Sequence, residues 1–213
     1  MSSYFQEHSG ALCLDPWETP GGGLRDYQEE AVARTHAHFQ TSRKPALICM
    51  PMGVGKMTVL MALCFKLEAK RVLVVTPWQL MREQIAEDIG ALRSLKNSGT
   101  VPLDFVPPKV KIVRDKITSD AQWQEVLDHD VVVANPQSLN PSLPDVIAPP
   151  EDAFDLIIFD EAEYSQADAW SALMDHFAAS RQVLLTATPF RDELLEIKAQ
   201  LVYRLVARLD LRP

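Results

Sequence analysis

The chain has 213 residues, 47% of them hydrophobic and 23% charged, with 15 Pro, 8 Gly and 3 Cys. This composition excludes a disordered polymer, a collagen-like repeat and a small domain held together by disulfides. The net charge of −8 disfavours a stand-alone nucleic-acid module of high affinity, because binding to a polyanion relies on cationic side chains. The densest basic run, which we interpret as solvated surface, is Lys109, Lys111, Arg114 and Lys116.

The cysteines and the absence of a long apolar run indicate the compartment. Cys13, Cys49 and Cys64 are an odd number and widely spaced, which favours buried thiols in a reducing environment over disulfides or a zinc site. No segment approaches the roughly 20 apolar residues that span a bilayer, and the first residues do not resemble a signal peptide. We expect a cytoplasmic protein, nuclear if the source is eukaryotic, that does not associate with membranes.

Short apolar runs alternate with amphipathic segments between two expected tails, residues 1–23 and 206–213. The first tail ends in Thr19-Pro20-Gly21-Gly22-Gly23 and lacks periodicity. The predicted strands are Ala46–Met50, Val72–Thr76, Val110–Val113, Val131–Ala134, Leu156–Asp160 and Val183–Ala187. The predicted helices are Asp26–Gln40, Lys56–Leu67, Gln79–Ile89, Asp120–Leu127, Ala167–Phe177 and Asp192–Leu201.

The strand pattern predicts the fold class. Uninterrupted apolar runs are typical of strands that are buried on both faces of a parallel sheet. Their alternation with helices favours an α/β fold, with a doubly wound, mostly parallel sheet and helices on both faces. We therefore expect one domain over residues 24–205.

A glycine-rich segment follows the first predicted strand. It reads Met50-Pro51-Met52-Gly53-Val54-Gly55-Lys56-Met57 and precedes an amphipathic helix. Glycines let a backbone curl until its N–H groups point at phosphate oxygens, and the helix N-terminus adds the positive end of its dipole. A lysine at this place reaches the terminal phosphates. The segment predicts a nucleotide site formed by Met52, Gly53, Val54, Gly55, Lys56 and Met57, in which Lys56 also serves catalysis.

One residue of this loop departs from the usual pattern. The lysine of a phosphate loop is normally followed by Ser or Thr, whose hydroxyl binds Mg²⁺. Here it is followed by Met57, whose soft thioether is a poor ligand for a hard cation. Thr58 is rotated by about 100° around the helix and is not expected to replace it. We expect weak metal dependence and slow hydrolysis.

Carboxylates end the fifth predicted strand. Asp160 and Glu161 stand at its carboxyl end, where doubly wound sheets bind their ligands. ATP hydrolysis needs one carboxylate that holds the metal and another that orients or deprotonates water. We expect Asp160 to hold Mg²⁺ through water and Glu161 to be catalytic.

Six segments in order resemble the motifs of the first RecA-like domain of superfamily-two DEAD/DEAH-box helicases, most closely the branch of type III restriction subunits. The resemblance covers roughly residues 24–200. It implies a RecA-like P-loop NTPase domain that binds ATP and Mg²⁺ and acts on nucleic acid, with DNA favoured over RNA. The segments are Leu24–Gln28, Met50–Met57, Val75–Pro77 with Leu80 and Gln84, Val133–Leu139, Asp160–Glu163 and Thr186–Pro189.

The resemblance also assigns roles to single residues. It implies that Gln28 contacts adenine and that Thr186 and Thr188 couple hydrolysis to domain movement. It further implies that a nucleic-acid backbone is contacted by Thr76, Pro77, Gln84 and Gln137. In the family, a second RecA-like domain supplies arginine fingers, and we expect that domain to be absent from this chain. We expect a separate RecA-like domain or a partner subunit to provide them.

Two alternatives stay open. Met52, Met57 and the missing second domain favour a degenerate, non-hydrolysing nucleotide-binding module that regulates or binds other proteins. A small-molecule kinase or GTPase would account for the phosphate loop and for nothing else in the pattern. Those families lack the Thr-Ala-Thr-Pro segment that this chain has. Among the tryptophans, which we interpret as packing residues, Trp78 is the exception to test for base stacking because it follows Pro77.

Overall fold

Seven parallel strands form a single sheet in the order β3-β4-β2-β5-β6-β1-β7. The computed structural model describes residues 3–12, 23–161, 168–187 and 199–205. Apart from β3 and β7 at the two edges, the strands are made almost wholly of buried side chains, which explains their uninterrupted apolar sequences. The strands are β1 Ala46–Cys49, β2 Val72–Val75, β3 Val110–Val113, β4 Val131–Ala134, β5 Leu156–Asp160, β6 Arg181–Thr186 and β7 Gln200–Arg204.

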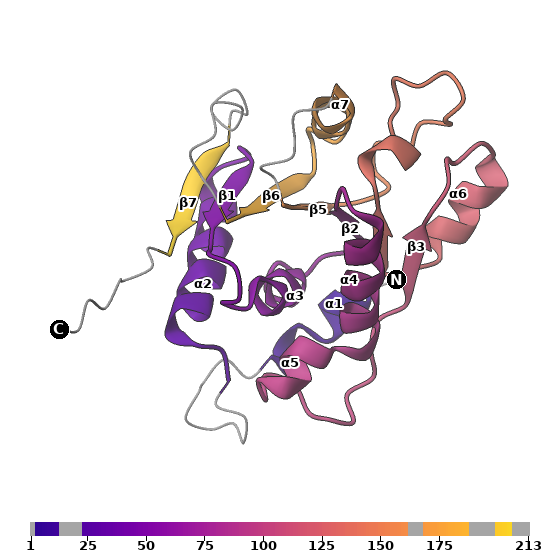
Figure 1. Ribbon diagram of the computed structural model, residues 1–213. Coiled ribbons are helices and arrows are strands. Elements are labelled where there is room, and N and C mark those ends of the chain that lie inside the picture. The colour runs from indigo at the N-terminus through magenta and orange to yellow at the C-terminus, as the bar shows by residue number, and fades with distance from the viewer. Residues whose placement is uncertain (1–2, 13–22, 162–167, 188–198, 206–213) are drawn as a thin grey trace.

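Helices cover both faces of the sheet (Figure 1). One face carries α2 Asp26–Thr41, α3 Lys56–Lys66 and α4 Gln79–Ala91, together with the short helices α1 Tyr4–Glu7 and α5 Arg93–Asn97. The other face carries α6 Asp120–Leu127 and α7 Asp168–His176. Two 3₁₀ turns, η1 Ser9–Ala11 and η2 Pro136–Ser138, complete the elements. The doubly wound α/β fold predicted from the sequence is therefore confirmed.

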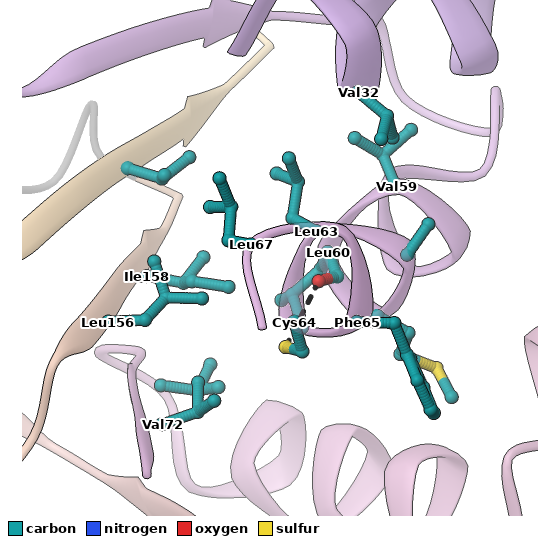
Figure 2. Close-up of a cluster of buried hydrophobic side chains, with 14 of the residues drawn as sticks. Val32, Val59, Leu60, Leu63, Cys64, Phe65, Leu67, Val72, Leu156 and Ile158 are labelled. Atoms are coloured by element: carbon teal, nitrogen blue, oxygen red, sulfur yellow. Dashed lines mark hydrogen bonds between the residues drawn. The ribbon is translucent and has the colours of Figure 1, made fainter. Parts of the chain in front are cut away.

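The pleat of the strands divides the buried side chains into two cores. Val72 and Val74 face the α2–α3–α4 layer, whereas Leu73 and Val75 face the layer of α6 and α7. Figure 2 shows the first core, where α3 points its apolar side chains at β2 and β5. Cys64 belongs to it and donates its thiol hydrogen to the carbonyl oxygen of Leu60 at 3.3 Å, an inert structural role.

The region predicted as an N-terminal tail contains a packed helix. Phe5 in α1 is 2% exposed and meets the ring of Phe65 of α3 edge-on, at 5.0 Å between centroids. The hydroxyl of Tyr4 donates to the carbonyl oxygen of Val106 at 2.7 Å. Four helical residues show too little periodicity for this packing to be read from the sequence. The division into a tail and a domain over 24–205 stays a prediction, and 206–213 lies outside the described residues.

The end of the domain also differs in detail from the sequence interpretation. A helix was predicted over 192–201, but Gln200 and Leu201 belong to β7, which pairs with β1; residues 192–198 lie outside the described part of the chain. The other predicted strands and helices are present with ends shifted by a few residues. Ser119 caps the N-terminus of α6, because its hydroxyl oxygen accepts a hydrogen bond from the backbone N–H of Gln122.

Candidate functional site

The glycine-rich segment forms a loop between β1 and α3 at the carboxyl end of the sheet. Gly53 and Gly55 have φ angles of 78° and 86°, in the left-handed region that glycine adopts without strain. A Cβ at Gly53 would meet nothing within 4 Å, so this side of the loop is open. The curled backbone, the open side and the start of α3 at Lys56 are the features that are typical of a phosphate-binding loop.

The start of α2 fixes the position of this loop. The carbonyl oxygen of Val54 accepts hydrogen bonds from the Tyr27 hydroxyl at 3.1 Å and from Gln28 Nε2 at 3.0 Å. The other end of the same amide, Gln28 Oε1, accepts from the backbone N–H of Arg25 at 3.0 Å. A Cβ at Gly55 would lie only 2.4 Å from Gln28 Nε2, so glycine is required there for space as well as for φ. The sequence pointed to Gln28 but not to Tyr27, whose role depends on a tertiary contact.

Lys56 and Glu161 lie together. The Lys56 Nζ donates to Glu161 Oε1 at 2.9 Å, and the two side chains are 13% and 14% exposed. Since β6 lies between β1 and β5, this bond bridges the ends of two strands that are not neighbours. The two predicted catalytic residues therefore lie within hydrogen-bond distance of each other at the carboxyl end of the sheet.

The acidic pair occupies the last position of β5 and the residue after it. Asp160 is buried, and Glu161 has a φ of 55°, a left-handed conformation that is unfavourable for a residue with a side chain. Such backbone conformations persist where the surrounding structure imposes them, and they gather at functional sites. Here the left-handed turn coincides with the contact between the Glu161 carboxylate and Lys56.

The residues after Lys56 give a mixed fit to Mg²⁺. Met57 is half-buried against the core, and Thr58, in the same first turn of α3, is buried. Among the described residues, no group of His, Cys, Asp or Glu forms a multi-ligand metal cage. Asp160 is an oxygen donor of the kind that Mg²⁺ prefers, whereas Met57 is not. Met52 is 81% exposed at the rim of the loop.

The residues predicted to contact nucleic acid follow β2 and β4, which are neighbours in the sheet. Gln84 and Gln137 are exposed and Pro77 is half-buried. Thr76 differs, because its side chain is fully buried and its hydroxyl has no hydrogen-bond partner. In this conformation the Thr76 side chain is therefore not accessible to a ligand.

The predicted coupling segment is bonded to the strand ahead of the loop. Thr186 ends β6, is fully buried, and its carbonyl oxygen accepts from the backbone N–H of Met50 at 2.9 Å. The Cys49 thiol contacts the carbonyl oxygen of the next residue, Ala187. Thr188 and Glu163 lie outside the described residues. The coupling role itself stays a prediction.

The basic run from Lys109 to Lys116 includes β3 and the residues on either side of it, and three of its cations have a carboxylate partner. Lys111 pairs with Glu125, Arg114 with Glu83, and Lys116 with Asp145. The pKa values of Glu125 and Asp145 lie below their usual range, mainly because the lysines donate hydrogen bonds to them.

In the described part of the chain, no helix combines the length and the apolarity that crossing a bilayer requires.

Comparison with known proteins agrees with this geometry. The profile of the family described as "Type III restriction enzyme, res subunit" matches residues 22–191. A curated relative, the type I restriction enzyme EcoAI endonuclease subunit of Escherichia coli, is 26% identical over 194 residues. That match covers 87% of this chain and 22% of the relative, so the chain spans about a fifth of the relative's length.

Solved structures match at the level of the fold. The helicase domain of Hef from Pyrococcus furiosus gives a TM-score of 0.58 at 22% identity, over 84% of this chain and 38% of that chain. The type ISP restriction-modification enzyme LlaGI, solved with a DNA substrate mimic, gives a TM-score of 0.59 at 20% identity, over 86% of this chain and 20% of that chain. Both share the parallel, doubly wound architecture with the present chain.

Proposed function

The chain belongs to the family of the type III restriction enzyme res subunit, and from this premise we propose that its helicase-type ATP-binding domain binds ATP with Mg²⁺ at the loop that precedes Lys56. In this proposal the N–H groups of Gly53 to Lys56 cradle the phosphates. The buried amide of Gln28 holds the loop through Arg25 and Val54, and it contacts the adenine when it turns away from these bonds. The bound nucleotide is coupled to a nucleic-acid strand, with DNA favoured over RNA.

The observation that carries the proposal is the bond of 2.9 Å between Lys56 Nζ and Glu161 Oε1. It brings the cation that would neutralise a terminal phosphate and the carboxylate that would orient water into one partly buried site. In the low dielectric of such a site, charged groups act more strongly than in bulk water. When phosphate enters, Lys56 can exchange its carboxylate partner for phosphate oxygens, which releases Glu161 to hold a water molecule.

Mg²⁺ fits this site through one carboxylate. The ion is normally held by one or two carboxylates, water and the phosphates of the substrate, and Asp160 meets that requirement. Bound there, it would neutralise charge on the phosphates. The hydroxyl that usually assists is replaced by Met57, which supports a weak metal dependence. In this proposal, a second RecA-like domain or a partner subunit supplies the arginine fingers. It approaches the loop from the side on which Met52 is exposed.

Nucleotide titration tests the binding site. A fluorescent ATP analogue should bind the wild-type protein, and Lys56→Ala should weaken its affinity about 10- to 100-fold through loss of charge-assisted hydrogen bonds. Lys44→Ala removes an equally cationic but exposed side chain and should bind as the wild type does. Equal affinity of Lys56→Ala and the wild type would refute the site.

The second candidate is a non-hydrolysing nucleotide-binding module, and Met57 is the specific observation in its favour. Met57→Thr restores the missing hydroxyl at the position where it binds Mg²⁺. Under this candidate, phosphate release stays at background for the wild type, with or without DNA. Under the main proposal, DNA stimulates release by the wild type, and Met57→Thr raises it about tenfold or more while strengthening its dependence on Mg²⁺. Phosphate release in a magnesium titration separates the two.

A further inference from the structure

Met52 differs from the other described methionines in its exposure. Its side chain is 81% exposed, and no large apolar side chain among the described residues is more accessible. Apolar side chains stabilise a fold in proportion to the surface that they bury, so Met52 contributes little to stability. The other described methionines are covered by the fold: Met50 and Met61 are at most 2% exposed, and Met57, Met81 and Met174 are half-buried.

The position of Met52 is next to the groups that are proposed to hold the phosphates. Met52 directly precedes Gly53 in the loop between β1 and α3, where the backbone turns through positive φ at Gly53 and Gly55. A Cβ at Gly53 would meet nothing within 4 Å, so the loop is open beside Met52. A chemical change at the Met52 sulfur would therefore take place at the edge of the nucleotide site.

The thioether of methionine is open to one simple covalent change. A peroxide oxidises the sulfur by two electrons and transfers one oxygen atom to it, while the second peroxide oxygen leaves as water. The product, methionine sulfoxide, is polar, and reductases that are specific for its two epimers reverse the change. Exposure decides which sulfur reacts first, which favours Met52 over the covered methionines.

From this juxtaposition we propose that Met52 is an oxidation site through which peroxides lower the affinity of the loop for ATP. The inference rests on the proposed function and adds a regulation of the same site. The sulfoxide oxygen is a hydrogen-bond acceptor that carries partial negative charge. The N–H groups of the loop and the cation of Lys56, which attract phosphate, attract this oxygen as well. The oxidised side chain thus competes with the nucleotide from within the loop.

The described cysteines are the competing targets of a peroxide, and the fold covers them. Cys49, at the end of β1, is 3% exposed, and its thiol contacts the carbonyl oxygen of Ala187. Cys64 is 2% exposed, and burial raises the pKa of its thiol. Because the thiolate is the reactive form and neither sulfur is accessible, both react slowly in the folded protein. Met52 is the more accessible target, and it is also the one beside the nucleotide site.

Brief treatment of the full chain with hydrogen peroxide, followed by titration with the fluorescent ATP analogue, tests this proposal. Mass spectrometry of the digested protein should find one added oxygen on Met52 before any other methionine. The dissociation constant of the treated wild type should rise about 3- to 10-fold, as expected when an acceptor within the loop takes up one hydrogen bond. Incubation with the two methionine sulfoxide reductases should restore the affinity, whereas a thiol reductant should not.

Two variants locate the effect by the ratio of their dissociation constants after and before treatment. Met52→Leu keeps every cysteine and every other methionine, and its ratio should be about 1 whatever its own affinity for ATP. Met174→Leu removes a half-buried methionine of α7 and should show the ratio of the wild type.

Three results would overturn the proposal. They are oxidation of another methionine ahead of Met52, an unchanged affinity of the wild type once Met52 carries its oxygen, and a response of Met52→Leu equal to that of the wild type. In the last case a cysteine thiol is the sensor instead. The untreated wild type keeps the outcomes apart: if it does not bind the analogue, the proposed function fails and this inference with it. Binding that peroxide does not weaken refutes the inference alone.

Discussion

At the scale of single residues, Glu161 combines an unfavourable backbone conformation with a carboxylate that binds Lys56. Its left-handed φ of 55° costs on the order of 1–3 kcal/mol, and the sequence gives no sign of it. The chemistry was easier to foresee: Lys56, Gly53, Gly55, Asp160 and Glu161 were identified by residue type and by position at strand ends. What could not be foreseen is the contact network, in which Tyr27 and Gln28 share the Val54 carbonyl oxygen.

Thr76 offers a prediction on stability. Its buried hydroxyl has no hydrogen-bond partner, so Thr76→Val exchanges an unsatisfied polar group for a methyl group of nearly the same size. The free energy of unfolding should rise by about 1 kcal/mol. Thr35→Val is the matched control, because Thr35 is equally buried but donates to the Ala31 carbonyl oxygen at 2.7 Å. That variant should lose about 1 kcal/mol.

Urea unfolding of the two threonine variants measures both changes. Opposite signs are expected, and a loss of stability in Thr76→Val would show that its hydroxyl is satisfied in solution.

At the scale of elements, the regular helices and strands followed from periodicity, but elements defined by tertiary contacts did not. β7 is the clearest case, since its first two residues, Gln200 and Leu201, were predicted as the end of a helix and the rest of the strand was not predicted. Its mostly exposed edge position gives it no continuous apolar run, and only pairing with β1 makes it a strand. Helix α1 is the second case, because one phenylalanine rather than a repeated pattern anchors it.

The anchoring of α1 can be tested by truncating that phenylalanine. Phe5→Ala removes a side chain that is nearly inaccessible and contacts Phe65, so the free energy of unfolding should fall by about 3 kcal/mol, as for other buried aromatic residues. Tyr4→Phe removes only the hydroxyl bonded to Val106 and should cost about 1 kcal/mol or less. Thermal unfolding gives both values. An unchanged midpoint for Phe5→Ala would mean that residues 1–23 behave as the tail that the sequence suggested.

At the scale of the whole molecule, the order of strands determines which motifs can meet. The phosphate loop follows β1 and the carboxylates follow β5, far apart in the chain. Parallel strands all end at the same edge, so every segment that follows a strand lies on that edge, and the alternation of apolar runs with helices predicted this much. The sequence could not supply the lateral order, because buried Val- and Ile-rich strands are nearly interchangeable in pattern. Only the pairing of β5 with β6, and of β6 with β1, brings Glu161 within reach of Lys56.

The same strand order separates two kinds of chemistry along one edge. The β5, β6 and β1 end holds Lys56, Glu161 and the Met50–Thr186 bond, a compact site suited to phosphate. The segments that follow β2, β4 and β3 carry three exposed side chains, Trp78, Gln137 and Arg114. β2 and β5 are neighbours, and their register runs without a bulge from Val72 with Leu156 to Val75 with Phe159. The segments that follow β5 and β2 are therefore joined through continuous, paired backbone, and this is the path by which we expect a change at the carboxylates to reach the segment after β2.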